Sequence, residues 1–514
     1  MRAGWIALGL YAVAAWGWGC SSSTTIDPDA GSVDAGSDAG GPLRIDAGQD
    51  AGQDAGFDAG FDADLDSCVI GEEWCNGDDD DCDGLVDEAP AAEHCALPSA
   101  TARCEAAACL IEACLGYHAD CDGDPANGCE IDLTTDHDRC GTCAHTCATG
   151  ETCADGLCDS ERIVDVSSGS EHSCAVRTNG AVWCWGDNRA GQLGNGTTTS
   201  HDVPAPVLGI EDAVDVECGG DYTCALHATG HLSCWGDNGM GELGDGTTIS
   251  TAVPVDVLLG GELVTSFAVG GVFDSGWPHT CAVVDSGGVR CWGEDNGGGL
   301  GDGRPWEYLP QPTPVDVVGI TDAVAVGVWV GTSCAVLRTG VVECWGDNYY
   351  GLLGDGSSDR SRLIPGPVSS LTRAVALASK AIASHAAVLD DTGTLWTWGL
   401  NGSGELGDGT TTASGVPVRA LGLDGVTVRS VGVGVGSTWI SLDTGRVLHV
   451  GLHFFDGDGA TTSWTEAPAI REAARVVPGG RGACVLHMHG SVSCAEVPLP
   501  TRAVPVIGLP PLGP

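Results

Sequence analysis

The chain has few basic residues. Its 514 positions hold 21 Lys and Arg against 71 Asp and Glu, a net charge of −50. Sequence-independent binding to nucleic acid needs dense Lys and Arg that neutralise phosphates. A chain this acidic repels phosphates, so we exclude nucleic acid as a partner, and basic proteins and divalent cations are favoured. Methionine is also scarce, with 3 residues, whereas glycine (80) and cysteine (26) are abundant.

The N-terminal apolar run lacks the length of a membrane span. It covers Ala3 to Gly19, 17 residues, which is short for a bilayer-spanning helix and typical of a signal peptide. The run ends directly before Cys20, and a small residue before Cys resembles the lipobox of bacterial lipoproteins, although Gly17 stands where that motif usually has Leu. We predict a lipoprotein signal peptide over 1–19 and lipidation of Cys20. An ordinary secretory peptide cleaved nearby is the alternative.

Two segments without a hydrophobic core follow. Residues 20–67 repeat Asp-Ala-Gly seven times and carry eleven Asp against one Arg. Such a segment cannot bury enough apolar surface to offset ordering, so we predict a disordered, self-repelling tether that spaces the protein from a membrane. A cation-binding sponge is the alternative. Residues 68–159 hold fourteen Cys, which predicts a largely irregular, disulfide-rich module whose connectivity stays open. This cysteine content indicates an oxidising compartment.

The remaining residues, 160–514, contain an internal repeat. A Trp-Gly motif recurs at Trp185, Trp235, Trp292, Trp345 and Trp398, at spacings of 50, 57, 53 and 53 residues, with weaker copies at Val450 and Ala495. The strong copies continue into a Gly-x-Leu-Gly loop, a Pro-Val strand and an alternating apolar strand. Four short strands in about 50 residues, seven times over, predict an all-β, seven-bladed β-propeller.

Paired cysteines within the repeat predict a hairpin geometry. Five copies place two Cys ten residues apart, and in each a Gly lies six residues after the first Cys. If the two Cys face each other across a hairpin, the residues between them pair across the two strands and leave a three-residue loop. This loop ends at the Gly, whose position requires the left-handed conformation that suits glycine. Opposed residues are close enough for a disulfide. We therefore predict Cys174–Cys184, Cys224–Cys234, Cys281–Cys291, Cys334–Cys344 and Cys484–Cys494, and a buried free thiol at Cys218.

These motifs resemble the regulator-of-chromosome-condensation repeat, whose units of about 50 residues form seven-bladed propellers. The resemblance covers about 350 residues, with degenerate sixth and seventh copies. It implies that Trp185 and its equivalents pack between blades. His172, His279 and His385 recur two residues before the first Cys position, which favours a structural hydrogen bond over a catalytic or metal-binding role. The namesake of the family is a nucleotide-exchange factor, but the loops and basic tail on which that activity depends have no match in this chain.

Two insertions in the third copy place aromatic side chains in loops. They contain Phe273 and Trp277, and Trp306 and Tyr308. Loops that break a repeat are good contact surfaces, and aromatic side chains dominate binding hot spots. We predict that these residues form binding loops, with local packing against the blade as the equal alternative.

An acidic motif in the Cys-rich module suggests a structural metal site. Many calcium-binding loops begin with oxygen ligands at every second position, followed by a Gly. Carboxylate ligands favour calcium over copper. The motif also resembles a metal-binding repeat of bacterial surface proteins. The predicted ligands are Asp79, Asp81, Asp83, Asp87 and Glu88, with a looser second set at Asp120, Asp122 and Asp124. The alternative is a solvated acidic loop joined by a Cys75–Cys82 disulfide.

The sequence thus predicts a non-enzymatic, lipid-anchored surface protein, monomeric and without a catalytic cofactor, whose propeller binds an unidentified protein or surface ligand. We expect it at the outer membrane or cell surface, with release into the medium as the alternative location. One alternative is an extracellular polymer-degrading hydrolase or lyase with an active site in the central channel. Another is a guanine-nucleotide exchange or signalling role by family analogy, which export would contradict.

Overall fold

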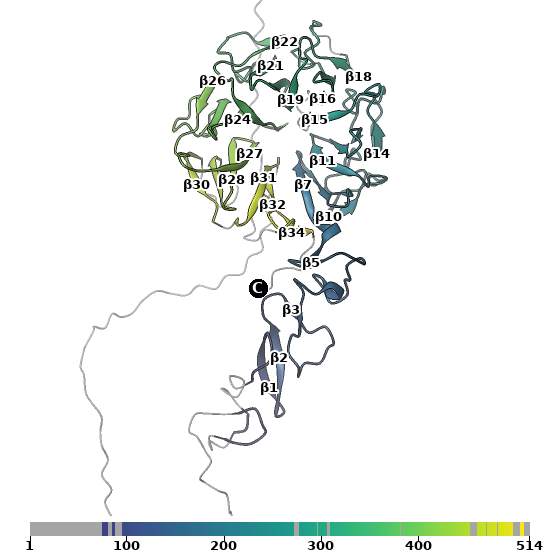
Figure 1. Ribbon diagram of the computed structural model, residues 1–514, viewed down its shortest axis with the longest axis vertical. Coiled ribbons are helices and arrows are strands. Elements are labelled where there is room, and N and C mark those ends of the chain that lie inside the picture. The colour runs from purple at the N-terminus through teal and green to yellow at the C-terminus, as the bar shows by residue number, and fades with distance from the viewer. Residues whose placement is uncertain are drawn as a thin grey trace, which may run out of the picture. The chain divides into compact units, whose positions relative to one another are not determined.

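The structure is a computed structural model, and it describes residues 74–80, 85–87, 95–271, 277–295, 297–305, 309–380, 382–452, 460–468, 470–480, 482–496 and 504–507. Within them, seven four-stranded antiparallel sheets surround a central channel (Figure 1). The predicted all-β, seven-bladed propeller is confirmed. None of the described residues lies in a helix that is both long and apolar enough to cross a bilayer.

Each blade is a meander whose first strand lies near the channel and whose fourth lies at the rim (Figure 1). Blade 1 comprises β7 (Ile163–Ser168), β8 (His172–Arg177), β9 (Val182–Gly186) and β10 (His201–Pro206). Blade 2 comprises β11 (Ala213–Cys218), β12 (Tyr222–His227), β13 (Leu232–Gly236) and β14 (Thr251–Asp256). Blade 3 comprises β15 (Val264–Val269), β16 (His279–Val284), β17 (Val289–Gly293) and β18 (Gln311–Asp316).

The other four blades repeat this order. Blade 4 comprises β19 (Ala323–Val328), β20 (Thr332–Leu337), β21 (Val342–Asp347) and β22 (Ser361–Pro367). Blade 5 comprises β23 (Ala374–Ala378), β24 (His385–Asp390), β25 (Leu395–Gly399) and β26 (Ser414–Arg419). Blade 6 comprises β27 (Val428–Gly434), β28 (Ser437–Leu442), β29 (Val447–Gly451) and β30 (Thr461–Glu466). Blade 7 comprises β31 (Ala473–Pro478), β32 (Gly482–His487), β33 (Val492–Glu496) and β34 (Val504–Ile507). Blade 7 therefore meets blade 1 without exchange of a strand.

The five predicted hairpin disulfides are present. Cys174 lies opposite Cys184 across β8 and β9, with 4.1 Å between their Cα atoms, and the same pairing recurs at the other four sites. The Gly that ends each loop has a positive φ, for example +81° at Gly180. In blade 6 the two cysteine positions hold Trp439 and His449, whose rings stack with centroids 4.5 Å apart. A direct side-chain contact thus replaces the disulfide in that blade.

Neighbouring blades are joined through one carbonyl of the Gly-x-Leu-Gly loop. The indole N–H of Trp235 in blade 2 donates to the carbonyl of Gln192 in blade 1 at 2.8 Å, and the hydroxyl of Thr223 donates to the same oxygen at 3.0 Å. The same carbonyl position accepts an indole N–H from the next blade at three more junctions, from Trp292, Trp345 and Trp398. All four rings are fully buried. The predicted packing of these tryptophans between blades is therefore confirmed.

The recurring histidines belong to the same junctions. His172, His279 and His385 are buried, and the Nε2 atom of each lies 2.7–2.8 Å from a hydroxyl of the next blade. Burial lowers the pKa of His172 to about 3 and that of His279 to about 4, so both rings are neutral near pH 7. These contacts agree with the predicted structural hydrogen bond.

The module before the propeller has little regular structure, as predicted. Its described residues contain three small sheets and two 3-10 turns. These are β1 (Ala100–Glu105) with β2 (Ala108–Cys114), β3 (His118–Ala119) with β4 (Ile131–Asp132), β5 (Cys153–Ala154) with β6 (Leu157–Cys158), and the turns His137–Arg139 and Asp159–Glu161. Six disulfides join its described residues: Cys75–Cys104, Cys95–Cys109, Cys114–Cys129, Cys121–Cys143, Cys140–Cys153 and Cys147–Cys158.

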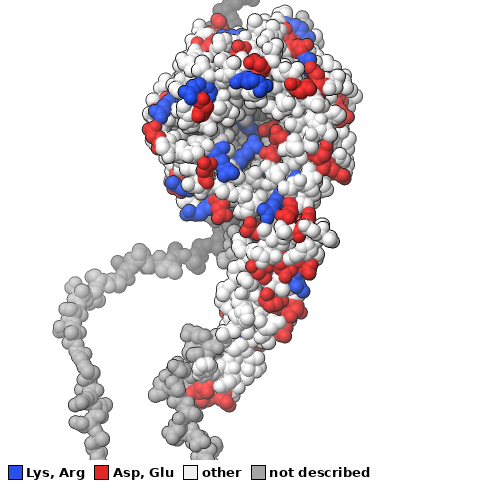
Figure 2. Space-filling model, viewed as in Figure 1, with Lys and Arg blue, Asp and Glu red and all other residues white. Residues whose placement is uncertain are grey.

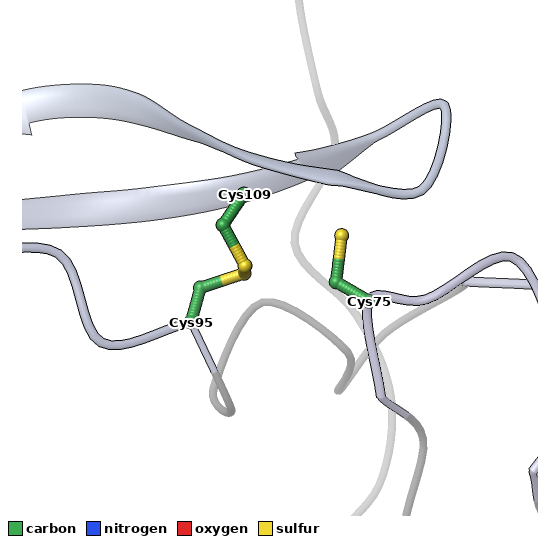
Figure 3. Close-up of side chains that lie close together, drawn as sticks. All are labelled: Cys75, Cys95 and Cys109. Atoms are coloured by element: carbon green, nitrogen blue, oxygen red, sulfur yellow. A yellow bond between two sulfur atoms is a disulfide. The ribbon is translucent and has the colours of Figure 1, made fainter. Parts of the chain in front are cut away.

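The proposed Cys75–Cys82 disulfide is wrong, because Cys75 pairs with Cys104. The hairpin of β1 and β2 explains the difference. It places Cys104 directly opposite Cys109, and each of the two bonds a cysteine from the preceding segment. Figure 3 shows the Cys95–Cys109 bond with Cys75 beside it. Cys82 lies outside the described residues.

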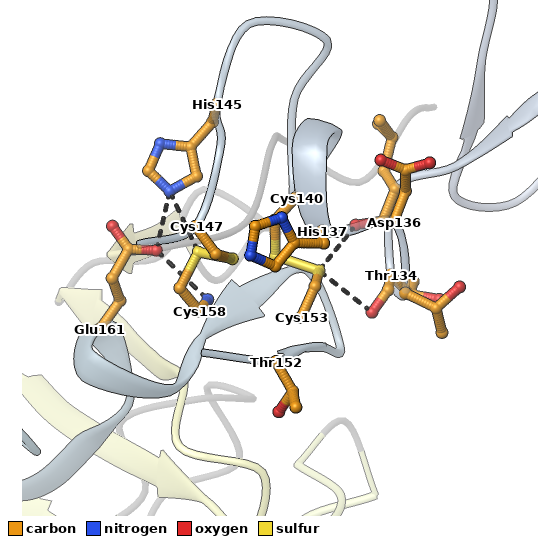
Figure 4. Close-up of a disulfide and its surroundings, with 12 residues drawn as sticks. Thr134, Asp136, His137, Cys140, His145, Cys147, Thr152, Cys153, Cys158 and Glu161 are labelled. Atoms are coloured by element: carbon orange, nitrogen blue, oxygen red, sulfur yellow. Dashed lines mark hydrogen bonds and ion pairs between the residues drawn. A yellow bond between two sulfur atoms is a disulfide. The ribbon is translucent and has the colours of Figure 1, made fainter. Parts of the chain in front are cut away.

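The last two disulfides of the module form its small core. Cys140, Cys147, Cys153 and Cys158 are all buried and pack together, in place of the aliphatic core that this segment lacks. The Nε2 atom of His145 lies 3.1 Å from Glu161 and 3.5 Å from the sulfur of Cys158 (Figure 4). Because that sulfur is part of a disulfide, the cluster is a packed structural unit and lacks the thiolate that a metal ligand requires.

A buried carboxyl in a junction loop makes stability depend on pH. Glu242 is 1% exposed, and burial raises the pKa of its side chain to about 8, from 4.5. A raised pKa in the folded state contributes stability that is present below pH 4.5 and lost as the pH rises through 8. Blade 1 has Gln192 at the equivalent position.

We therefore expect Glu242→Gln to reduce the loss of folding stability at alkaline pH. Its thermal midpoint should exceed that of the wild type by several degrees at pH 9 and match it near pH 4.5, because the carboxyl is then protonated in both states. Thermal unfolding followed by circular dichroism at pH 4.5, 7 and 9 measures this difference. A constant offset between the two proteins at all three values would contradict the assignment.

Candidate functional site

Charged side chains gather at the central channel on a few blades only. The inner strands of blades 1, 2 and 7 supply Asp165, Asp215, Glu217 and Arg475, and Lys380 follows the inner strand of blade 5. Figure 2 shows basic and acidic side chains facing one another around the central hollow. Together with Ser167, we call these residues the channel cluster.

The channel cluster links blades that are not neighbours in sequence. The Nζ atom of Lys380 donates to the hydroxyl of Ser167 at 3.0 Å and lies 3.6 Å from a carboxylate oxygen of Glu217. The Arg475 guanidinium pairs with Asp165 and lies 3.7 Å from the other oxygen of Glu217. Lys380 is 7% exposed, so its charge is held in a largely dry site. Blade 5 is thereby tied to blades 1 and 2, and blade 7 to the same pair.

Hydrogen bonds orient the acidic members of the cluster. Ser167 donates to Glu217 at 3.0 Å and accepts from the backbone N–H of Cys218 at 3.0 Å, while Asp165 accepts from the backbone N–H of Val216 at 3.1 Å. Burial, followed by the nearby charges of Asp165 and Glu217, raises the pKa of Asp215 well above its usual value. The raised pKa favours the neutral form of Asp215, which shares the site with two cations and with the carboxyl groups of Asp165 and Glu217.

This arrangement is better suited to holding the ring than to chemistry. Every charge of the cluster has a partner within it, which offsets the desolvation that an unpaired buried charge would suffer. The neighbouring thiol of Cys218 is the one described cysteine outside a disulfide, as predicted. Burial raises the pKa of this thiol to about 12, so the reactive thiolate is not populated at neutral pH.

Several residues that the sequence marks as functional lie outside the described residues. They are Cys20, Asp81, Asp83, Glu88, Phe273, Trp306 and Tyr308. Trp277 is described: it is half-buried with a φ of +78°, and its backbone N–H donates to the Glu294 carboxylate at 2.6 Å. Its backbone is therefore anchored to the blade. This contact fits the packing alternative and leaves the binding role a prediction.

The described acids of the two predicted metal loops bond to backbone N–H groups. Asp87 accepts from Asn76 and Gly77 at 2.9 and 3.0 Å. Asp120 accepts from Gly123 at 2.7 Å, and Asp122 accepts from Asp124 at 2.9 Å. The bond from the Asp124 N–H, helped by one from the Asn127 amide, lowers the pKa of Asp122. Asp79 and Asp124 belong to the same loops. Calcium binding here remains a prediction.

Motif searches along the sequence miss the channel cluster, because its members break the repeat instead of forming a motif. Asp165 and Asp215 stand where the inner strands of blades 4 and 5 have Ala325 and Ala376. Lys380 is the only lysine of the chain. A lone lysine next to an inner strand, in a chain of net charge −50, is the signal that could have found the site.

Loss of Lys380 should destabilise the propeller. Removing one partner of a buried ion pair costs about 3 kcal/mol, because the remaining charge is left uncompensated. We expect Lys380→Met to lose about this amount in chemical denaturation and the double variant with Glu217→Gln to lose less. A decrease in the free energy of unfolding of about 0.5 kcal/mol or less, which is typical of surface substitutions, would contradict a stabilising contact between blade 5 and blades 1 and 2.

Comparisons with known proteins agree with this geometry. Two family models of the regulator of chromosome condensation (RCC1) repeat match the chain, one at residues 179–226 and 392–440 and the other at 163–192 and 213–242. The human E3 ubiquitin-protein ligase HERC2 is 32% identical over 285 residues, which are 55% of this chain but 5% of that protein. The ultraviolet-B receptor UVR8 of Arabidopsis thaliana is 29% identical over 171 residues, 32% of this chain and 38% of the receptor. This chain thus spans a minor part of each relative.

Solved structures share the fold. Human WBSCR16 superimposes with a TM-score of 0.53 at 18% identity, covering 62% of this chain and 85% of that chain. Prp20p of Saccharomyces cerevisiae, described with its binding properties to Gsp1p and histones, superimposes with a TM-score of 0.54 at 19% identity, covering 65% and 87%. At this identity the likeness concerns the fold alone. The chain therefore carries RCC1 repeats within a seven-bladed β-propeller.

Proposed function

We propose that this protein is exported, anchored to the cell surface through a lipid on Cys20, and acts as a monomeric, non-enzymatic binding platform for a protein or surface ligand. The observation that carries the proposal is the state of the cysteines. Eleven disulfides join the described residues, and only Cys218 among them is a free thiol. Such a density of disulfides forms and persists in an oxidising compartment.

A binding role fits the propeller and its charge. Yeast RCC1 (Prp20), which has this fold, has been crystallised with Kap60 and is described with its binding to Gsp1p and histones. The fold alone does not transfer those partners. The net charge of −50 favours a basic partner and steers its approach, more strongly at low salt.

The channel acids are the feature on which a hydrolase or lyase would depend. Asp165 and Glu217 are held by Arg475 and Lys380. A polymer-cleaving site needs carboxyl groups that can approach a substrate, and these two are engaged across the ring. We therefore favour binding over polymer degradation, and likewise over nucleotide exchange by family analogy.

Two measurements on the full chain test the proposal. In a bacterial host with lipoprotein processing, a labelled fatty acid should enter the wild type and not Cys20→Ala. The full chain should also retain a specific ligand from cell-surface extract or culture medium, which the reduced and unfolded chain does not retain. Absence of label in the wild type would contradict the lipid anchor. Equal retention of the ligand by folded and unfolded protein would contradict the binding role of the propeller.

We further propose that calcium binds the acidic loops of the Cys-rich module in a structural role. Their exposed carboxylates lie on short loops braced by disulfides such as Cys121–Cys143, and hard oxygen ligands suit calcium. Calorimetric titration of the full chain should detect binding that Asp120→Asn with Asp122→Asn weakens at least tenfold. Asp285→Asn, in an exposed turn of blade 3, is the control. Absence of binding heat together with unchanged thermal stability in calcium would contradict the site.

A further inference from the structure

Among the described residues, the junction between blade 7 and blade 1 lacks the indole contact that joins blades 1 to 5. At the four junctions described above, an indole N–H meets the carbonyl of a Gly-x-Leu-Gly loop from the preceding blade. In blade 7, the chain between β33 and β34 reads Val-Pro-Leu-Pro-Thr-Arg-Ala and contains no such loop. Trp185 of blade 1 nevertheless stands in the equivalent position, on β9 opposite Ser173.

The donors for the missing carbonyl are present. No described residue accepts a hydrogen bond from the indole N–H of Trp185, and its side chain is 8% exposed, against 0% for Trp235, Trp292 and Trp345. The hydroxyl of Ser173, which corresponds to Thr223 at the first junction, turns to Ser168 at 3.0 Å instead. Blade 1 therefore carries both groups that bind the loop carbonyl elsewhere in the ring, with the hydroxyl engaged by Ser168 in this structure.

A cavity of about 260 Å³ occupies this place. It is lined by Trp185 and Ser173 of blade 1 and by the backbone of Gly479, Gly480 and Gly482 of blade 7. The hydroxyl of Ser170, a residue 7% exposed, also faces this cavity and has no hydrogen-bond partner. An unpaired buried hydroxyl is unfavourable and indicates a group that completes the site.

The charged side chains among the described lining residues are acidic. Glu171, Asp187 and Asp202 contribute to the lining, and Arg189 pairs with Glu171 at 3.2 Å and with Asp187 at 2.9 Å. On the same face, burial together with the charges of Asp237 and Asp187 raises the pKa of Asp221 to about 6. A raised pKa at a half-buried carboxyl agrees with a negative potential at this face. A ligand with a positive charge is therefore favoured.

We propose that this seam binds a loop of another protein that replaces the missing Gly-x-Leu-Gly segment. The loop would place a backbone carbonyl against the indole N–H of Trp185, an aliphatic side chain against the ring, and a basic side chain near Asp187 and Asp202. The cavity is smaller than a typical pocket for a small-molecule ligand, which fits the insertion of one loop. The inference goes beyond the platform role, because it assigns a particular surface and a ligand chemistry.

A peptide with the sequence of residues 188–196, Asn-Arg-Ala-Gly-Gln-Leu-Gly-Asn-Gly, is the probe, because this segment fills the first junction and carries one Arg. It should bind the full chain saturably and more weakly as salt is raised. A peptide in which the leucine is replaced by aspartate and the arginine by glutamate should not bind. Absence of saturation by the first peptide at millimolar concentration would overturn the proposal.

Two tryptophan variants separate binding from folding. Trp185→Phe keeps the ring and removes the N–H, so it should lower peptide affinity about 2- to 10-fold, the range of one hydrogen bond, without a change in thermal midpoint. Trp235→Phe removes the same group from a filled junction, so it should lower the thermal midpoint and leave peptide affinity unchanged. Equal effects of the two variants on affinity would overturn the seam site.

Three further outcomes test the proposal. Slow hydrogen exchange at the Trp185 indole in the free protein would mean that the chain's own residues fill the seam, which overturns a partner loop. A surface ligand captured equally by the wild type and by Trp185→Phe would likewise overturn the seam and leave the platform role intact. Loss of salt dependence in Asp202→Asn, with peptide binding retained, would support the assigned charge contact.

Discussion

The propeller depends on one carbonyl oxygen at each of the four junctions from blade 1 to blade 5, which accepts an indole N–H and, at three of them, also a hydroxyl from the next blade. This contact explains the motif. The final glycine of the first loop, Gly194, has a φ of +64°, and a Cβ atom on it would lie 2.7 Å from the indole nitrogen of Trp235. Leu193 is fully buried beside it. The tryptophan, the leucine and the glycines therefore recur together because each shapes the same contact.

Buried polar groups give the ring its order. The junction histidines and hydroxyls fix each blade against the next, while the channel cluster joins blades that are distant in sequence. Both sets are paired, so a wrong register would leave buried charges or donors without partners. The apolar surfaces between blades are similar from repeat to repeat and cannot by themselves select a register. We infer that the polar pairs make the assembly of seven similar units specific.

Much of the propeller could be predicted because its information is local. Opposed cysteines ten residues apart, with a glycine at a fixed place, define a hairpin on their own. The disulfide between Cys75 and Cys104 was not predicted, because it depends on the hairpin of β1 and β2, and no short sequence motif indicates that hairpin. Lys380 was missed because its partners come from the far side of the ring. Blade 6 has Val450 in place of the junction tryptophan, and Trp464 of its outer strand packs against Gly407 instead, a replacement visible only in three dimensions.

The hairpin disulfides join residues ten apart, and each lies within a single blade. No cross-link of the described propeller therefore spans two blades, and oxidation of one repeat cannot scramble the topology of another once its hairpin has formed. A repeat can be duplicated, lost or recombined as a unit, because it carries its complete covalent connectivity. Blades 5 and 6 have neither cysteine, so the two positions of a blade hold both cysteines or none.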